Sequence, residues 1–248
     1  MASIKALAEL VPFKTKHGIR VKIITKWNAA TGFFSHKKSM LLGDAKGFKI
    51  EATIDDERTL PDGIILEVGA WFEIYNFKLT RSSGFIRPTK SRYQIKLCEL
   101  SVFSKIEPLN ESYFLCLTNF KSIIQGLSHS MFCIDLCGAL VGVFDIEDIE
   151  EEPAEIVGSM TKRMKFSLIN IGLTQIKCVA YGRQAQELYD LWSSTTANTV
   201  ICVLRLWRIE WGQDGFQYMT NTDFSEILFD HDIPEIKDFQ SRIPKNSY

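Results

Sequence analysis

The chain has 248 residues, enough for two compact domains of about 100–125 residues each. Its composition, 46% hydrophobic and 24% charged, is ordinary for a globular protein, and no apolar run approaches the roughly 20 residues that a bilayer requires, so we expect no membrane partner. The net charge of −1 is the balance of two opposite halves. Residues 1–107 carry 18 Lys and Arg against 11 Asp and Glu, whereas residues 108–248 carry 11 against 19. The basic half predicts a polyanionic partner, although two halves of opposite charge could instead dock on each other.

In chain order, the first half is a series of strands with alternating apolar and polar side chains. A turn-rich connection over residues 55–67 separates the third strand from the fourth, and a Ser-Ser-Gly turn follows the fourth. This order is typical of an OB-fold, a five-stranded Greek-key barrel whose closure removes exposed sheet edges. The expected strands span residues 18–27, the two arms of a hairpin over 37–54, 70–79 and 93–103.

One hairpin pattern occurs twice, about 126 residues apart, which indicates two copies of one β-domain. In the second copy, an acidic loop over residues 145–155 precedes the hairpin and a helix over 184–192 follows it. We therefore predict an all-β fold with short helices, arranged as tandem OB-fold barrels. The domains are expected at residues 1–107 and 131–248, with a linker over 108–130 and a C-terminal helical tail. The matched hairpin positions are Met40 and Phe166, Leu42 and Leu168, Asp44 and Asn170, Ala52 and Cys178, and Ile54 and Ala180.

No catalytic, metal or cofactor site is expected. Cys133 and Cys137 are close in sequence, but four residues along a strand separate their sulfur atoms by roughly 13 Å, too far to share a zinc ion. The sequence has neither a Gly-rich phosphate loop nor a Ser-His-Asp or Cys-His arrangement at a spacing that suggests catalysis, so we expect a non-enzyme. Three tryptophans lie within strand patterns and are expected in the core: Trp27, Trp71 and Trp207.

Three segments resemble one family, the large subunit of replication protein A, and specifically its two central DNA-binding OB-folds in their plant-type form. They are KSMLLGDAKGFKIEATI (38–54), KRMKFSLINIG with IKCVAYG (162–182), and DIPEI (232–236). The resemblance extends over residues 4–242 and implies single-stranded DNA binding by base stacking and phosphate contacts. The family's N-terminal barrel and zinc-bearing C-terminal barrel have no counterpart here, so we expect the chain not to join the usual heterotrimer.

The resemblance implies two stacking aromatic side chains in each barrel, one just after the third strand and one on the loop between the fourth and fifth strands. In the first barrel the first position falls on Ile54, which is not aromatic and so departs from the family's pattern. The second falls on Phe85, although Phe85 could instead pack under its own loop. Glu51 stands where the family has a basic residue. The basic residues expected to contact phosphates are Lys37, Lys38, Lys78, Arg81, Arg87, Lys90 and Arg92.

In the second barrel, Tyr181 takes the first stacking position, with a place in the core as the alternative. Trp211 supplies the second position, together with Phe216 across the turn. The acidic segment 145–155 would repel phosphates or stay solvated, so we expect better aromatic contacts in the second barrel and better electrostatics in the first. The expected phosphate contacts are Arg163, Lys165, Arg183 and Arg208.

These observations predict a nuclear single-stranded DNA-binding protein of replication, repair, recombination or mobile-element transposition. One alternative is a protein-interaction module that keeps the barrels and has little affinity for nucleic acid. Another is selective binding of telomeric strands or RNA in the same grooves.

Overall fold

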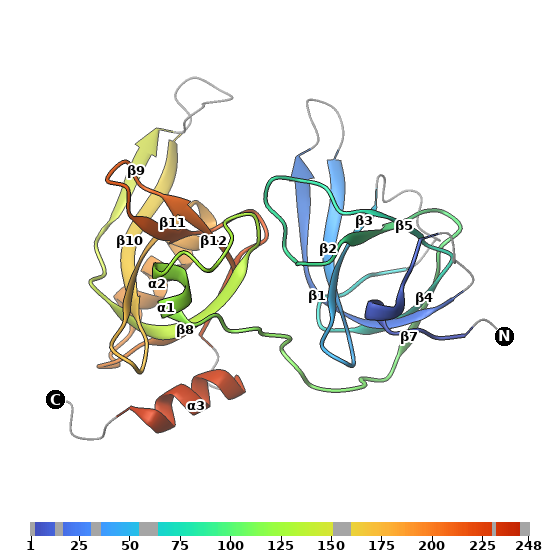
Figure 1. Cartoon of the computed structure of the whole chain (residues 1–248). Coiled ribbons are helices and arrows are strands. Elements are labelled where there is room, and N and C mark those ends of the chain that lie inside the picture. Colours follow the sequence, from blue (N-terminus) through green and yellow to red (C-terminus); the bar gives the residue numbers. More distant parts are fainter. Residues whose placement is uncertain are drawn as a thin grey trace. The chain divides into compact units, whose positions relative to one another are not determined.

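The computed structural model divides the chain into two compact units, residues 1–114 and 115–248 (Figure 1). It describes residues 3–12, 17–30, 36–54, 64–150, 160–229 and 232–243. No described helix has the length and apolarity needed to cross a membrane. Residues 108–130, expected as a linker, contain helix α1 (Phe120–Ile124), whose Phe120 and Ile123 are part of the second unit's core.

In the first unit, the described strands form one sheet in the order β5-β6-β3-β2-β1-β4-β7, and its antiparallel pairs are joined by the parallel pair β3–β6. Strands β4 and β5 are two parts of the expected fourth strand, and β6 and β7 are two parts of the fifth. Because β4, next to one end of this order, leads directly into β5 at the other end, the chain itself connects the two sides of the sheet, as in an OB-fold barrel. The strands are β1 (Ile19–Ala30), β2 (His36–Asp44), β3 (Lys49–Ile54), β4 (Trp71–Tyr75), β5 (Lys78–Arg81), β6 (Tyr93–Leu97) and β7 (Val102–Ile106), preceded by the 3-10 helix η1 (Leu7–Glu9).

In the second unit, hydrogen bonds close a ring of five strands in the OB-fold order β8-β10-β11-β13-β12, with β12 paired again to β8. Helix α2 contacts β10 and β11 between the third and fourth strands, where the sequence predicts a helix. The elements are β8 (Ile134–Val141), β9 (Ile146–Glu150), β10 (Met160–Ile169), β11 (Gln175–Tyr181), α2 (Arg183–Ser194), β12 (Ile201–Trp211), β13 (Gln217–Thr220), β14 (Glu226–Leu228) and α3 (Pro234–Arg242).

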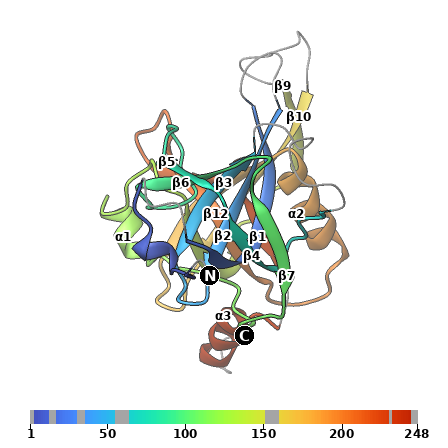
Figure 2. The same cartoon turned by 90° about the vertical axis from the view of Figure 1, so that its right-hand side faces the viewer.

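Strand β9 corrects the expectation of an acidic loop over residues 145–155. Residues 146–150 pair antiparallel with the first half of β10, and residues 151–159 lie outside the described residues. The two strands extend together from one end of the second unit in both views (Figures 1 and 2). Opposite charge favours the pairing, because Asp148 lies across from Lys162 and Glu147 across from Arg163.

The repeated hairpin has the same register in both units. Met40 pairs with Ala52 in the first unit, as Phe166 pairs with Cys178 in the second. All four side chains are buried, so each hairpin presents its alternate residues to its own core. The repeat that the sequence indicates is therefore confirmed in three dimensions.

A second repeated feature interrupts the fourth strand of each unit. Asn76 and Leu206 both have a positive φ, at 55° and 58°. The hydroxyl of a buried serine donates to the backbone oxygen at each position, from Ser101 at 3.0 Å and from Ser225 at 2.7 Å. The kink turns the next residue inward, where Phe77 and Trp207 fill equivalent places in the two cores.

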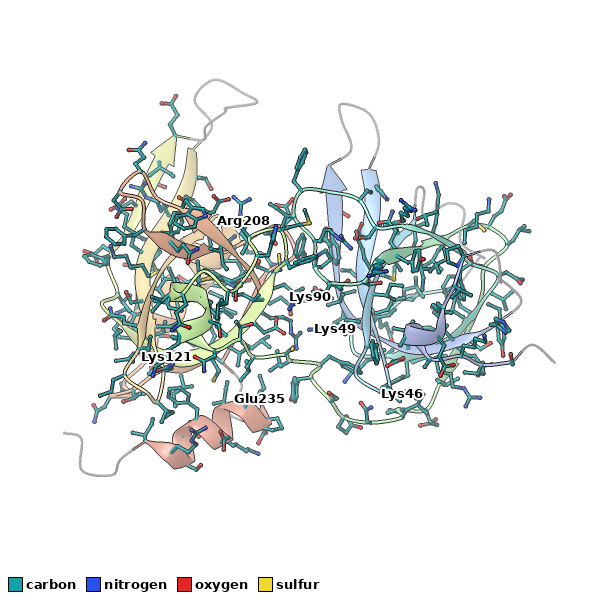
Figure 3. The ribbon with its side chains drawn as sticks, viewed as in Figure 1. Lys46, Lys49, Lys90, Lys121, Arg208 and Glu235 are labelled. Atoms are coloured by element: carbon teal, nitrogen blue, oxygen red, sulfur yellow. The ribbon has the colours of Figure 1, made fainter. Side chains whose placement is uncertain are left out.

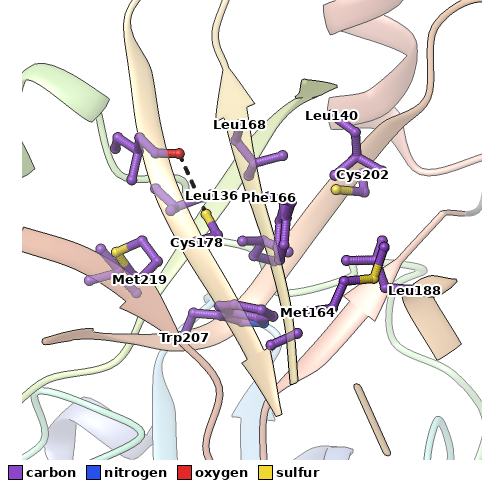
Figure 4. Packing of buried hydrophobic residues seen from close by; sticks show 14 of the residues in the cluster. Leu136, Leu140, Met164, Phe166, Leu168, Cys178, Leu188, Cys202, Trp207 and Met219 are labelled. Carbon is purple, nitrogen blue, oxygen red and sulfur yellow. Dashed lines mark hydrogen bonds between the residues drawn. The ribbon is translucent and has the colours of Figure 1, made fainter. Parts of the chain in front are cut away.

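Each unit has its own hydrophobic core. Figure 4 shows the second core, in which Phe166 and Trp207 meet edge to face with ring centroids 5.8 Å apart, and Cys178 donates to the backbone oxygen of Ile176. Trp27, Trp71 and Trp207 are all buried, as expected, and of the three Trp207 is a member of one of these two core clusters.

Asp44 fixes the hairpin turn of the first unit and joins it to the N-terminal segment. Its carboxylate accepts hydrogen bonds from the backbone N–H groups of Lys46, Phe48 and Leu7, at 3.0, 3.0 and 2.8 Å. Asp44→Ala removes the acceptor of all three hydrogen bonds and leaves a buried N–H unpaired, so we expect the free energy of unfolding of the first unit to fall by about 3 kcal/mol. Urea denaturation checks this value.

Asn170→Ala is the matched control for Asp44→Ala. The amide oxygen of Asn170 accepts from the backbone N–H of Thr174 at 2.9 Å, as part of the equivalent turn. We expect this change to lower the stability of the second unit by only about 1 kcal/mol. Equal losses in the two variants would contradict a special role for the Asp44 carboxylate.

Candidate nucleic-acid interface

Strands β10, β11, β13 and β12 of the second unit present one face to the core and the other outward. Cross-strand pairing identifies the outward side chains, because residues directly opposite each other lie on the same face. We call this surface the second outer face, and it combines tyrosines with charged side chains. Its members are Arg163, Lys165, Lys177, Tyr181, Arg208, Glu210 and Tyr218.

One end of the second outer face leads into a pocket of about 560 Å³. Its walls include Trp211 and Phe216, whose side chains are 61% and 67% exposed, and Tyr218. Helix α1 contributes Ile124 on another side. The pocket therefore offers aromatic rings to a ligand from solvent, as base stacking requires.

Lys177 lies beside this pocket and carries positive charge to it. Its Nζ is 5.7 Å from the centre of the Phe216 ring, a cation–π contact, and 3.9 Å from a carboxylate oxygen of Asp214. Its side chain is exposed. An ammonium group next to a stacking ring is suited to bind the phosphate that follows a stacked base.

At the other end of the same face, Tyr181 lies opposite Arg163 on the neighbouring strand. Its backbone is held by Asn221, which accepts from the Tyr181 N–H at 2.7 Å and donates to the Tyr181 oxygen at 3.2 Å. Tyr181 is half-buried and lies on the face opposite to the buried Ala180. This placement disfavours the core alternative and leaves stacking as a prediction.

The three arginines expected to contact phosphates in the second unit each have a carboxylate partner. Arg163 pairs with Glu147 at 2.5 Å, Arg208 with Glu210 at 2.6 Å, and Arg183 with Glu187 at 3.2 Å. Lys165 is exposed, and it helps Arg163 to lower the pKa of Glu147. Glu147, Glu210 and Glu187 thus each neutralise one of these arginines. Arg208 is labelled in Figure 3.

In the first unit, Phe85 lies in the loop between β5 and β6 with 96% of its surface exposed. This exposure excludes the alternative in which the ring packs under its own loop. Arg87, in the same loop, is half-buried and donates to the backbone oxygen of Ser91. Lys90 is labelled in Figure 3. The exposed basic residues that surround Phe85 along the chain are Lys78, Arg81, Lys90 and Arg92, and Lys37 and Lys38 on β2 are half-buried.

The hairpin register corrects the assignment of Ile54 to a stacking position. Ile54 pairs with Lys38 as Ala180 pairs with Met164, and both Ile54 and Ala180 are buried. The counterpart of Tyr181 is therefore the next residue, Asp55, which lies outside the described residues. A shift of one residue along a strand moves a side chain to the opposite face.

The same register shows that equivalent positions differ in chemistry between the units. The first unit has Arg81 where the second has Trp211, and Glu51 where the second has Lys177. Lys78 corresponds to Arg208, so this basic position is retained. Among the described residues of the first unit, the loop residue Phe85 is the most exposed aromatic ring.

Glu51 is a half-buried carboxyl on the outer face of the first unit. Burial raises its pKa above the usual 4.5, against the opposing attraction of Lys37 and Arg87. The folded unit therefore favours the protonated form of Glu51. The contribution of this protonated carboxyl to stability is complete below pH 4.5, the usual pKa, and is lost as the pH rises through the raised pKa of the folded state.

We therefore expect Glu51→Gln to stabilise the first unit at pH 7 and to lose this advantage as the pH falls toward about 4.5. Urea denaturation of the variant and the natural chain at several pH values measures the difference. The other titrating groups are the same in both proteins, so their contributions cancel in the difference between the two unfolding free energies. A stability difference that does not change with pH would contradict the role of burial.

The sequence reasoning missed two residues of the second outer face, Lys177 and Tyr218. Both could have been found from strand alternation, because Lys177 shares the face of Tyr181, and Tyr218 follows Phe216 at the same two-residue period. Burial raises the pKa of Tyr218, with the neighbouring Tyr181 and Glu210 as further causes.

Among the described residues, no group of three or more His, Cys, Asp or Glu side chains is arranged to hold a metal ion. Cys137, Cys178 and Cys202 are buried, whereas Cys116 is exposed. Burial raises the pKa of the Cys137 thiol to about 12.

Comparisons with known proteins agree with this fold. The family described as "Domain of unknown function DUF223" matches residues 8–126. A replication protein A heterotrimer bound to single-stranded DNA is similar with a TM-score of 0.60 and 12% identity, over 96% of this chain and 54% of that one. The chain thus spans about half the length of the structure it matches. A comparison with curated proteins finds no match.

Two further solved structures are more distant. Fission yeast Pot1 with single-stranded DNA has a TM-score of 0.34 and 11% identity, over 96% of this chain and 92% of that one. An OB domain from Methanosarcina mazei has a TM-score of 0.33 and 21% identity, over 43% and 87%. The chain is therefore similar in fold to replication protein A over almost its whole length, and its first half matches the DUF223 family.

Proposed function

We propose that this chain is a non-enzymatic protein that binds single-stranded DNA in the grooves of its two OB-fold units. In the second unit, bases stack on Trp211, Phe216 and Tyr181 while Lys177 binds phosphate. In the first unit, Phe85 stacks and the surrounding basic residues bind phosphates. Its cellular role is the protection of exposed strands in replication, repair, recombination or transposition, in the nucleus, as a relative of the plant-type large subunit of replication protein A.

The observation that carries this proposal is the group of exposed aromatic rings at the pocket of the second unit. A large aromatic side chain left in water forgoes about 1.5–3 kcal/mol of burial, so two neighbouring rings with most of their surface exposed call for a ligand. Stacking on a nucleobase contributes about 1–3 kcal/mol for each base and needs no particular sequence. Lys177, at the same pocket, supplies the positive charge that binds a phosphate.

The test is the fluorescence anisotropy of a labelled mixed-sequence oligonucleotide, offered as single-stranded DNA, duplex DNA and single-stranded RNA across a salt series. We expect binding to the single-stranded DNA and little to the duplex. The logarithm of affinity should fall with the logarithm of salt concentration at a slope of roughly −0.7 for each phosphate neutralised. Equal binding of duplex would contradict recognition by stacking, and equal binding of RNA would remove the preference for DNA.

A protein-interaction module is the second candidate, and the ion pairs of the second unit favour it. Arg163 and Arg208 already have carboxylate partners, which lowers the net positive charge available to phosphates. Absence of binding to any oligonucleotide at low salt, where electrostatic attraction is strongest, would leave this candidate in place of the first.

A further inference from the structure

The position of Glu147 on the second outer face has a consequence for binding. The β9–β10 register places Glu147 directly opposite Arg163, and the β10–β11 register places Tyr181 on the other side of Arg163. The three side chains therefore form one row across the groove. The arginine that a nucleic acid would meet beside Tyr181 is already paired.

The geometry of this pair matches the way in which arginine binds phosphate. The Nε and Nη2 atoms of Arg163 both donate to Oε2 of Glu147, at 3.1 and 2.5 Å. Two donors of one guanidinium fork are the groups that recognise a phosphate oxyanion. The carboxylate thus holds two donors of the kind that a phosphate would use.

A second arginine of this face, on β12, also has a carboxylate partner, but through one nitrogen, because its Nε has no hydrogen-bond partner. Arg208 Nη2 lies 2.6 Å from Glu210 Oε1, and both residues face outward beside Tyr218 and Thr220. Both charges are partly shielded from solvent, with 29% and 33% of their side chains exposed. The two arginines of the second outer face therefore each carry an internal counter-ion.

We propose that Glu147, with Glu210 in support, acts as an internal competitor of phosphate that limits the affinity of the second unit for single-stranded nucleic acid. This inference rests on the function proposed above. Strand β9 is then an affinity-limiting element: a bound strand must displace the Glu147 carboxylate from Arg163 and tolerate it nearby. Bases stack at the Trp211 pocket, while phosphate binding at the Tyr181 end stays weak.

The expected effect is moderate. A partly exposed ion pair opens at little cost, but the released carboxylate remains within a few ångströms of the incoming phosphate and repels it. Glu147→Gln should therefore strengthen binding of single-stranded DNA by about three- to tenfold at low salt. The salt slope should steepen by up to roughly 0.7, because Arg163 then replaces one more counter-ion on the DNA.

Asp148→Asn provides a matched control on the same strand. Asp148 pairs with Lys162 at 2.6 Å, and Lys162 lies on the face of β10 that also carries the buried Met164. Both changes remove one negative charge from β9, but only Glu147 faces the groove. An effect of total charge alone would appear equally in the two variants.

The experiment measures the anisotropy of a labelled single-stranded DNA with the full chain and with Glu147→Gln, Glu210→Gln and Asp148→Asn, each checked for folding by circular dichroism. Tighter binding and a steeper slope in the two Gln variants, with Asp148→Asn unchanged, would support the inference. Unchanged or weaker binding by the Gln variants, or an equal gain in Asp148→Asn, would overturn it while the proposed function stands. No binding by any of the four proteins would overturn both.

Discussion

The double variant Trp211→Ala, Phe216→Ala is expected to bind single-stranded DNA at least about 30-fold more weakly than the natural chain. Each ring contributes about 1–3 kcal/mol by stacking on a base, so losing both removes about 2 kcal/mol or more. Both side chains are mostly exposed, and Trp211 is the last residue of β12. We therefore expect the fold to survive. Anisotropy measures the affinity, and circular dichroism checks the secondary structure.

Trp192→Ala is the control for this experiment. Trp192 lies near the end of α2 with 38% of its surface exposed and does not line the pocket. Its loss should leave the affinity unchanged. If the double variant keeps both its fold and its affinity, the aromatic rings at the pocket do not bind DNA, and the protein-interaction module becomes the better account.

Much of the fold could be predicted because strand alternation is a local signal. Met40 and Leu42 face the same core as Ala52, and Phe166 and Leu168 face the same core as Cys178, as the sequence pattern indicates. The helix expected over residues 184–192 is α2, which extends a little further at both ends. Proline at the first position of α3 also agrees with the predicted helical tail.

The acidic segment was not predictable in the same way. Read by itself, a run of Asp and Glu indicates a solvated loop, but residues 146–150 form a strand because basic residues of β10 lie opposite them. That partner is more than ten residues away in sequence, so no local pattern contains it. The ion pairs that reduce the charge of the candidate site have the same non-local origin.

The errors at the site itself follow from the two-residue period of strands. Ile54 was assigned one position too early, and this single step is the difference between a core residue and an outward one. Lys177 was missed although it shares a strand face with Tyr181. Phe85 could be identified as a loop residue, but only the structure shows that nothing in its own loop covers it.

The second large effect is expected on stability, from the loss of Trp207. Trp207 is the largest side chain at the centre of the second core. Its ring is fully buried, meets Phe166 edge to face at 84°, and donates from Nε1 to the backbone oxygen of Glu226 at 3.2 Å. Trp207→Ala opens a cavity and leaves that oxygen without its donor. We expect the free energy of unfolding of the second unit to fall by about 3–5 kcal/mol.

The matched change in the first unit is Phe77→Ala, because Phe77 fills the place in the first core that Trp207 fills in the second. Since each unit has its own core, Trp207→Ala should lower only the stability of the second unit and Phe77→Ala only that of the first. Hydrogen exchange of the full chain in urea, followed separately for peptides of residues 1–114 and 115–248, distinguishes them. If either variant destabilises both sets of peptides equally, the two barrels unfold as one cooperative structure. A nucleic acid held by one barrel would then stabilise the other as well, because ligand binding to the folded state stabilises every part that unfolds with the site.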